Sequence, residues 1–209
     1  MMNINDLLIG IKKSEQNALE LIDDAELMFY NGRYPRAFAL YQLANEEIGK
    51  CSLMQYYILQ NNKDNLANFL KEFRSHKIKT SYSNGIEMII YNYLNESNKK
   101  LLLETIIYNS KNIEKINDLK NYSLYTSFIE SKFMIPSEIL TKEDVEVHLN
   151  YVVLRFNIIK VINKLFIENY NVLINEFSKL NVEENVLEFL DKEKGIIDTL
   201  SYEEVFRKH

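Results

Sequence analysis

The chain has 209 residues, 46% of them apolar, with only 5 glycines and 2 prolines, which favours one domain built from long helices over a turn-rich sheet protein. Its net charge of −5 excludes the global positive field that drives nonspecific nucleic-acid binding. No apolar run reaches the ~18 residues of a membrane span, and the N-terminal stretch lacks the pattern of a signal peptide. We therefore expect a single cytoplasmic, all-α domain over residues 1–209 that does not enter a membrane.

Two long helices joined by a short turn are expected first. Apolar residues at the 3.6-residue period predict a helix over residues 5 to about 30, which Asn31-Gly32 ends. Pro35 suits the first turn of the next helix, which continues to about residue 60, so the two form an antiparallel hairpin. The buried face of the first helix is expected to hold Leu8, Ile11, Ala18, Ile22, Ala25 and Phe29.

The middle of the chain is predicted to contain two further helices. A polar break at residues 61–64 and a short segment from Asn65 lead into a helix that starts in FRSHKIKT and reaches about Asn95. After a second polar break, a fourth helix is expected through about Asn117. The helical period is then lost over residues 119–136, LKNYSLYTSFIESKFMIP, where we expect a loop or a short extended piece.

A long fifth helix closes the bundle. The sequence Thr141-Lys142-Glu143-Asp144 has the pattern of a capping box, with Thr141 as the N-cap. The helix is expected to continue to about Ser178, which completes a core bundle over about 5–178 and leaves a C-terminal helical tail over about 181–209. Its predicted apolar stripe contains Leu149, Val152, Phe156, Ile159, Phe166, Tyr170, Leu173 and Phe177.

Two adjacent glutamates and a lysine interrupt the apolar pattern of the second helix. Glu46 and Glu47 lie between apolar or small residues, and Lys50 follows one turn later as the expected partner. A desolvated carboxylate without a partner costs roughly several kcal/mol, so the fold must pair it or use it. Gly49 costs about 1 kcal/mol relative to alanine in a helix, which indicates that a helix or a ligand approaches the backbone there. The alternative is a solvated surface pair worth about 0.3–0.5 kcal/mol.

A concentrated basic cluster follows the second helix. Its members are Lys71, Arg74, His76, Lys77 and Lys79. His76 and Lys79 are one helical turn apart, so they can share a face. The cluster is either a phosphate-contacting patch in which His76 acts as an acid or base near neutral pH, or a solvated basic face. The other histidines, His148 and His209, are expected to be incidental.

Three further candidates for chemistry are Lys120, Tyr122 and Tyr125, in the segment without helical period. They are either loop residues with a function or aromatic cover for a core edge. Cys51 is the single cysteine, which excludes an intrachain disulfide and suits a small core residue better than a nucleophile. Neither a clustered Cys/His pattern nor a P-loop or dinucleotide-binding glycine pattern occurs, so we expect no metal and no cofactor.

Three sequence blocks together resemble the AbiV family of abortive infection proteins. NGRYPRAFALYQLANEEIGK, residues 31–50, resembles the family's signature region, a helix that ends in an EExGK element. HKIK, residues 76–79, is similar to its downstream His-Lys element, and LKNYSLYTSF, residues 119–128, resembles its third block. The resemblance covers roughly residues 23–156.

The resemblance implies a HEPN-like all-α antiparallel bundle that acts in bacterial antiphage defence by arresting translation or RNA metabolism. It also implies a homodimer, because many HEPN proteins are dimers with a ribonuclease site at the interface. Their usual catalytic motif places a histidine four to six residues after an arginine. In this chain His76 follows Arg74 with one residue between them, and Arg155 comes after His148. The usual metal-independent arrangement is therefore not matched.

The nuclease hypothesis still assigns a role to each candidate. His76 is the general acid or base for attack by a ribose 2′-hydroxyl. The residues assigned to the phosphorane charge are Arg74, Lys77 and Lys79. Those assigned to orient this cluster across the second and third helices are Glu46, Glu47 and Lys50. Lys120 and Tyr125 are supporting candidates.

Two other hypotheses remain open at this point. A noncatalytic effector would bind a phage protein or a translation component, with the Glu/Lys cluster as a polar network and the basic patch as its docking surface. A housekeeping helical adaptor is the third. The partners expected for a nuclease or for a noncatalytic effector are a second copy of the chain, RNA (tRNA, rRNA or mRNA) and a phage-encoded activator protein.

Overall fold

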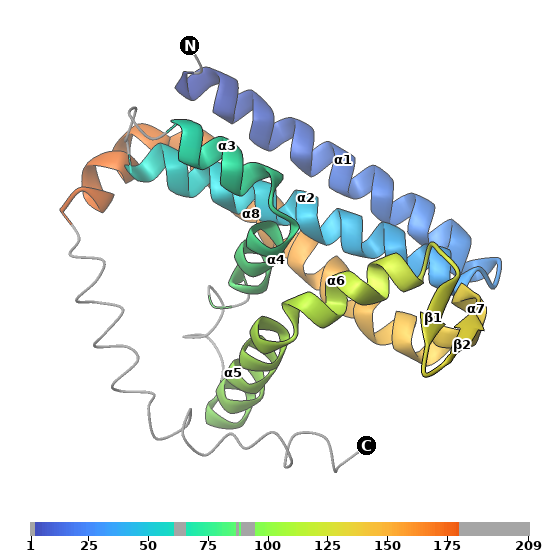
Figure 1. The fold of residues 1–209 in the computed structure, drawn as a ribbon. Helices are drawn as coiled ribbons and strands as arrows, with labels where there is room; N and C mark the ends of the chain where they lie inside the picture. The colour runs from blue at the N-terminus through green and yellow to red at the C-terminus, as the bar shows by residue number, and fades with distance from the viewer. Residues whose placement is uncertain (1–2, 61–65, 87, 89–94, 180–209) are drawn as a thin grey trace.

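The computed structural model describes residues 3–60, 66–86, 88 and 95–179. This part is all-α with one small hairpin, as the sequence predicted (Figure 1). The elements are α1 (Ile4–Tyr30), α2 (Tyr34–Gln60), α3 (Leu66–Arg74), α4 (His76–Asn84), α5 (Glu96–Lys111), α6 (Ile113–Tyr122), β1 (Ser127–Ile129), β2 (Lys132–Met134), α7 (Pro136–Ile139) and α8 (Lys142–Phe177).

Helices α1 and α2 form the predicted antiparallel hairpin. Asn3 caps α1 and exchanges hydrogen bonds with Asp6 in a capping box. The turn between the helices places Gly32 at φ +70°, a conformation that glycine adopts at low cost. Of the predicted buried face, Ile11, Ala18, Ile22 and Ala25 are buried, whereas Leu8 and Phe29 are only partly buried.

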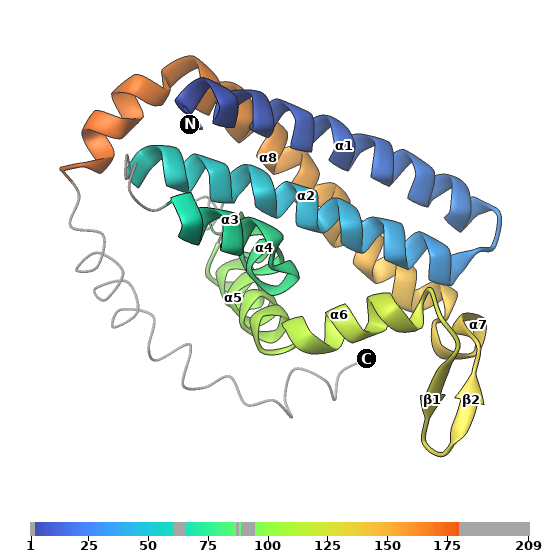
Figure 2. The same cartoon turned by 45° about the horizontal axis from the view of Figure 1, so that its top comes forward.

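Helix α8 packs against α2 and, over a shorter stretch, against α1, so the three long helices form the core (Figure 2). Thr141 caps α8 through the predicted capping box with Asp144. The buried residues of α8 include Val145, Val152, Phe156, Ile159 and Phe166. Leu173 was expected on this stripe but is exposed, because the C-terminal end of α8 extends past its neighbours.

The expected third helix is wrong in its extent. The segment that precedes it is itself helical and forms α3, and α4 starts only at His76 and ends at Asn84 rather than near Asn95. Ser75 separates α3 from α4 because its backbone is extended and its Oγ accepts a hydrogen bond, at 3.4 Å, from the amide of Ile78. Gly85 caps the C-terminal end of α4.

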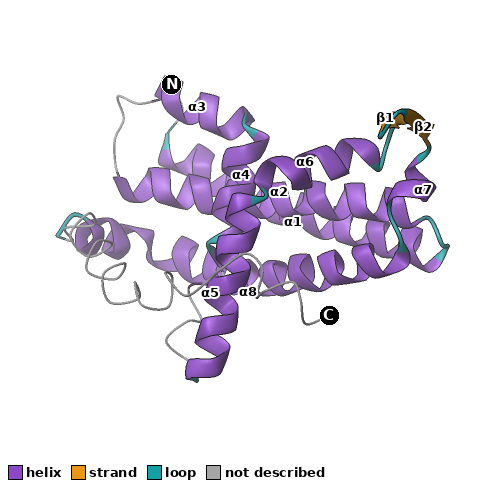
Figure 3. Ribbon diagram, turned by 60° about the horizontal axis from the view of Figure 1, so that its bottom comes forward, coloured by secondary structure: helices purple, strands orange, loops and turns teal. Residues whose placement is uncertain are grey.

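The expected fourth helix is also wrong in its extent. It is divided into α5 and α6, and α6 continues to Tyr122, so Lys120 and Tyr122 lie on a helix and not in an irregular segment. The expected extended piece is the hairpin of β1 and β2, whose turn places Glu130 and Ser131 at positive φ. Helix α6 packs against α2 and α4, while α5 extends away from the layer of long helices (Figure 3).

The predicted break at 61–64 and the predicted tail helices lie outside the described residues. None of the described helices is long and apolar enough to cross a membrane.

Candidate functional site

The site is built where α4 crosses α2 at Gly49. A Cβ at this glycine would lie 1.8 Å from the carbonyl oxygen of Lys79, far inside van der Waals contact. The sequence predicted a close approach at Gly49, and the approaching element is the backbone of α4. This contact brings the first turn of α4 against Glu46, one turn earlier on α2.

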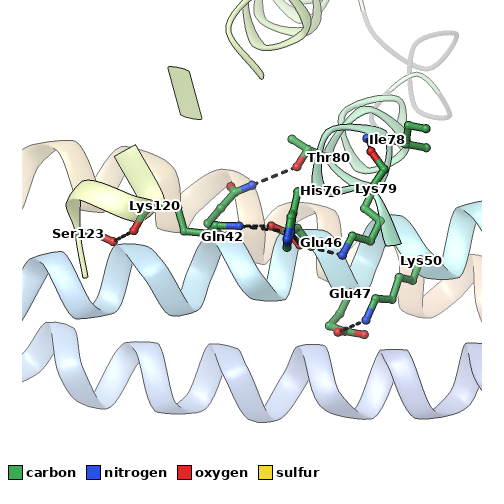
Figure 4. Close-up of polar contacts among 11 residues, drawn as sticks. Gln42, Glu46, Glu47, Lys50, His76, Ile78, Lys79, Thr80, Lys120 and Ser123 are labelled. Carbon is green, nitrogen blue, oxygen red and sulfur yellow. Dashed lines mark hydrogen bonds and ion pairs between the residues drawn. The ribbon is translucent and has the colours of Figure 1, made fainter. Parts of the chain in front are cut away.

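Glu46 is a buried carboxylate that joins three helices (Figure 4). Its Oε2 lies 2.5 Å from Nδ1 of His76 and 3.0 Å from Nζ of Lys79, both on α4. Its Oε1 accepts a hydrogen bond of 2.7 Å from Nζ of Lys120 on α6. Only 3% of the Glu46 side chain and 8% of each lysine side chain is exposed, whereas 55% of the His76 side chain is exposed.

The carboxylate of Glu46 is ionised in this environment. Burial raises its pKa, but hydrogen bonds from Lys120, His76 and Lys79, together with the charge of Lys120, outweigh burial, so the pKa lies below the ordinary value of 4.5. Two ammonium groups then surround one carboxylate. The cluster therefore keeps a net positive charge even with a neutral imidazole, in a protein that is acidic overall.

The tautomer of His76 follows from this ionisation. An ionised carboxylate can only accept hydrogen bonds, so the 2.5 Å contact requires that Nδ1 of His76 carries the proton and donates it to Glu46. Nζ of Lys120 lies 3.4 Å from the same Nδ1. Because both nitrogens carry protons, Lys120 donates its hydrogen bond to Glu46 and not to His76. The other ring nitrogen, Nε2, makes no hydrogen bond to the part of the chain that the structure describes. His76 thus has one nitrogen fixed and one available for proton transfer.

Further buried polar contacts extend the site along α2, and the sequence analysis did not predict them. Nε2 of Gln42 donates to Oγ1 of Thr80 at 3.1 Å. Oδ1 of Asn45 accepts from Oγ of Ser83 at 2.5 Å and from Nη1 of Arg155 at 3.1 Å. These contacts hold α4 and α8 against α2. A possible signal was the position of Asn45, directly before the two glutamates on a helix that is otherwise apolar at this level.

Lys50 was expected to pair with the two glutamates, and it pairs with Glu47 but not with Glu46. Nζ of Lys50 bonds Oε1 of Glu47 at 2.5 Å and lies 5.2 Å from the ring centre of Phe73 on α3. Glu47 and Lys50 therefore form a separate pair within α2, beside Phe73 of α3, and do not touch the cluster at Glu46. Phe73 adds a favourable cation–π contact to that pair.

The residues of the predicted basic patch do not form one surface, because each has a different environment. Lys79 is buried on Glu46, and Lys77 forms an exposed ion pair with Glu114 of α6. Arg74 ends α3 and is exposed. Tyr125 is also exposed, in the connection after α6, and joins no contact of the cluster. The structure thus brings together Glu46, His76, Lys79 and Lys120 from the predicted site residues.

The remaining candidates for chemistry are enclosed. Burial raises the pKa of the Cys51 thiol to about 12, and its Sγ lies 3.6 Å from the carbonyl oxygen of Ile11. The ring of His148 stacks on Phe38, with ring centres 4.5 Å apart. Burial, aided by the charge of Arg155, lowers the pKa of His148 to about 3, so its ring stays neutral. Among the described residues, no group of three or more His, Cys, Asp or Glu side chains could hold a metal ion.

Comparison with known proteins gives one family. The model of the HEPN family AbiV matches residues 6–155, which is more than two thirds of the chain and includes every residue of the cluster at Glu46. No curated protein and no solved structure matches the chain.

Proposed function

The chain belongs to the AbiV family of abortive infection proteins, and we propose that it arrests infected cells by cutting RNA with His76 as the proton-transfer residue. Family membership indicates the defence role. The observation that supports the chemistry is the half-exposed imidazole whose Nδ1 is held by the buried, ionised carboxylate of Glu46. A carboxylate in this position fixes the tautomer and stabilises the imidazolium that forms when Nε2 takes up a proton.

The proposed step is cleavage by the neighbouring ribose. Nε2 of His76 removes the proton of a 2′-hydroxyl, and the 2′-oxygen attacks the adjacent phosphorus while the bond from phosphorus to the 5′-oxygen breaks. The 5′-oxygen leaves with a proton from water or from the imidazolium. The products are a 2′,3′-cyclic phosphate and a 5′-hydroxyl end, and no redox step or co-reactant is needed.

The other candidates differ in what they contribute. Lys79 and Lys120 keep the cluster positive but donate to Glu46, so they attract the phosphate through their field rather than by direct contact. Arg74, exposed one residue before the N-cap of α4, is the side chain proposed to contact the phosphate. Glu47 and Lys50 take no part in this step because they pair with each other.

The test is to identify the chemical ends of the RNA fragments that the protein produces. Purified wild-type protein is incubated with 5′-labelled tRNA and total RNA in EDTA, alone and with extract of phage-infected cells, since we propose a phage protein as the trigger. Cleavage that leaves 2′,3′-cyclic phosphate ends, is lost in His76→Ala and is retained in Lys115→Ala supports the proposal. Lys115 is an exposed lysine of α6 and serves as the matched surface control. Cleavage by His76→Ala at the wild-type rate contradicts the proposal.

A second candidate, a noncatalytic effector, is favoured by a different observation. Phe128 and Phe133 face each other across the β1–β2 hairpin, with ring centres 5.0 Å apart, and are 64% and 78% exposed. Solvent-exposed faces of small sheets are ordinarily polar, so this aromatic pair suits contact with a protein of the phage or of the translation machinery. Translation arrest with intact RNA, abolished by Phe133→Ser and unaffected by His76→Ala, would select this candidate.

A further inference from the structure

Lys120 of α6 reaches both members of the pair that Glu46 forms with His76 (Figure 4). Its Nζ donates to Oε1 of Glu46 at 2.7 Å and lies 3.4 Å from Nδ1 of His76. Only 8% of the Lys120 side chain is exposed, so solvent screens its charge little. An ammonium group at this distance acts on the imidazole as well as on the carboxylate.

The two charged neighbours of Nδ1 have opposite effects on the protonation of His76. A carboxylate beside an imidazole favours the imidazolium, whereas an ammonium disfavours it. Glu46 is ionised, because its pKa lies below the ordinary value of 4.5. With Glu46 as its one charged neighbour, His76 would hold a second proton well into the neutral range. Its Nε2 would then already carry the proton that a general base has to accept.

Among the described residues, only Glu46 and Lys120 bring a charge within hydrogen-bonding distance of Nδ1 of His76. Lys79 of α4 contacts Oε2 of Glu46 at 3.0 Å and acts in the same direction as Lys120, through the shared carboxylate. The charged groups that the helices around His76 add are paired with each other or at least partly exposed: Glu47 with Lys50 on α2, Lys77 of α4 with Glu114 of α6, Glu72 and Arg74 on α3, and Lys111 on α5. Solvent screens their effect on the imidazole.

Contacts at both ends of α6 fix the place of Lys120. Near the start of the helix, Glu114 pairs with Lys77 of α4. Just after its end, the carbonyl oxygen of Leu124 accepts a hydrogen bond of 3.0 Å from Nη1 of Arg36 on α2. The ammonium of Lys120 is therefore held beside the imidazole by a helix that packs on both α2 and α4.

We propose that Lys120 acts through His76: its charge offsets that of Glu46, so the imidazole stays neutral near physiological pH and Nε2 is available as a base. The use of this neutral ring rests on the proposed RNA cleavage. Its charge state does not, because it is a property of the protein without substrate. Lys120 is thus a positioning residue, which sets the proton affinity of Nε2 without touching the RNA.

The test is a pH titration of the histidine rings in the full-length protein by nitrogen-15 NMR, which reports the tautomer and the charge of each ring. His76→Gln identifies the signal of His76. In the wild type we expect a neutral ring with its proton on Nδ1 at about pH 7.5. An imidazolium at that pH would overturn the proposal, whether or not any variant folds.

Variants of Lys120 test where the effect comes from. Lys120→Met removes the charge, and the titration midpoint of His76 should rise by about 1–2 pH units, because Glu46 then acts on the ring without the opposing ammonium. Lys120→Arg keeps the charge and should stay close to the wild-type midpoint. Lys115→Met is the matched control, since Lys115 is an exposed lysine of the same helix, and it should leave the midpoint unchanged. An unchanged or lower midpoint in Lys120→Met overturns the proposal.

The same spectra show whether each variant is folded. The buried ring of His148 stays neutral in the intact core and serves as the reference signal. If Lys120→Met does not fold, Lys120→Gln replaces it, because glutamine removes the charge but keeps a hydrogen-bond donor for Glu46. It should raise the midpoint of His76 as well, and a midpoint equal to that of the wild type would contradict the proposal.

Cleavage rates separate this inference from the proposed nuclease. In Lys120→Met the acid limb of the pH–rate profile should move to higher pH by the same amount as the NMR midpoint, because a protonated Nε2 cannot accept the proton of the 2′-hydroxyl. A raised midpoint in a protein that cuts no RNA would keep the role of Lys120 and reject the nuclease. Cleavage by Lys120→Met with the wild-type pH profile would reject the role of Lys120 and keep the nuclease.

Discussion

The α-carbon of Gly49 and the carbonyl oxygen of Lys79 are so close that a single methyl group would not fit between them: its carbon would lie 1.8 Å from the oxygen. The carbonyl belongs to the backbone of α4 and cannot rotate away. The distance between α2 and α4, and with it the contact of Glu46 with His76, therefore depends on the missing side chain of one glycine.

Gly49→Ala should displace α4 and destabilise the protein. Overpacking a tight contact typically costs about 1–3 kcal/mol, and a clash with backbone belongs at the upper end or beyond. Urea denaturation followed by circular dichroism measures the loss. Gly85→Ala is the control, because a Cβ there would lie 3.7 Å from its nearest neighbour at an ordinary helical φ. Equal stability of both variants would show that α4 does not rest on α2 at this point.

Glu46→Gln should destabilise the protein most near neutral pH. The substitution leaves Lys79 and Lys120 buried without a countercharge, and breaking a buried ion pair costs about 3–5 kcal/mol. Since the folded pKa of Glu46 is lowered, its contribution is present above the ordinary pKa of 4.5 and is lost as the pH falls through the folded value. The difference in unfolding free energy between wild type and variant should therefore shrink in acid.

The control for this pH series is Glu114→Gln. The pKa of Glu114 is also lowered, by a hydrogen bond from Lys77, but both side chains are largely exposed and solvent screens their pair. Its removal should leave the unfolding curve unchanged at every pH. A Glu46→Gln protein that behaves in the same way would mean that the buried cluster contributes nothing to stability.

Local sequence patterns were sufficient for the long helices. The period of the apolar residues gave α1, α2 and α8 nearly to their ends, and Thr141 with Asp144 gave the start of α8, because a capping box is complete within four residues. Gly49 indicates a point of close approach because glycine destabilises a helix interior, a cost that close packing explains. These features depend on neighbours along the chain.

The partner of Glu46 could not be found in this way. Local spacing offered Lys50, one turn away, whereas the structure supplies Lys120, 74 residues further along. That choice depends on how α6 packs against α2, which no short pattern encodes. The sequence prediction put Lys120 in an irregular segment, because Ser, Thr and aromatic residues follow it and break the apolar period before α6 ends at Tyr122. Glu46, His76, Lys79 and Lys120 were thus each candidates from the sequence, but their meeting in one cluster was not predicted.

Cys51 should be almost inert in the folded protein. Burial raises the pKa of its thiol from 9.0 to about 12, which lowers the thiolate fraction near pH 8 by about a thousandfold. Reaction with a chromogenic disulfide should therefore be slow in buffer and should release one equivalent per chain in denaturant. Fast reaction of the native protein would mean that the contact between Cys51 and Ile11 on α1 opens readily.

His148 should make the fold sensitive to mild acid. Burial and the charge of Arg155 lower its pKa from 6.5 to about 3. The unfolded chain takes up this proton below pH 6.5 and the folded chain does not, so stability falls with pH over this window. The loss approaches about 1.4 kcal/mol per pH unit well below pH 6.5 and amounts to about 1.6 kcal/mol between pH 6.5 and pH 5.

His148→Gln removes this titration and should flatten the fall of unfolding free energy between pH 6.5 and pH 5, whatever its effect at pH 7. His209→Gln changes the last residue of the chain and should retain the wild-type slope. Urea midpoints at four or five pH values measure both variants. An unchanged slope in His148→Gln would show that the ring, although stacked on Phe38, opens to water and is protonated in the folded state.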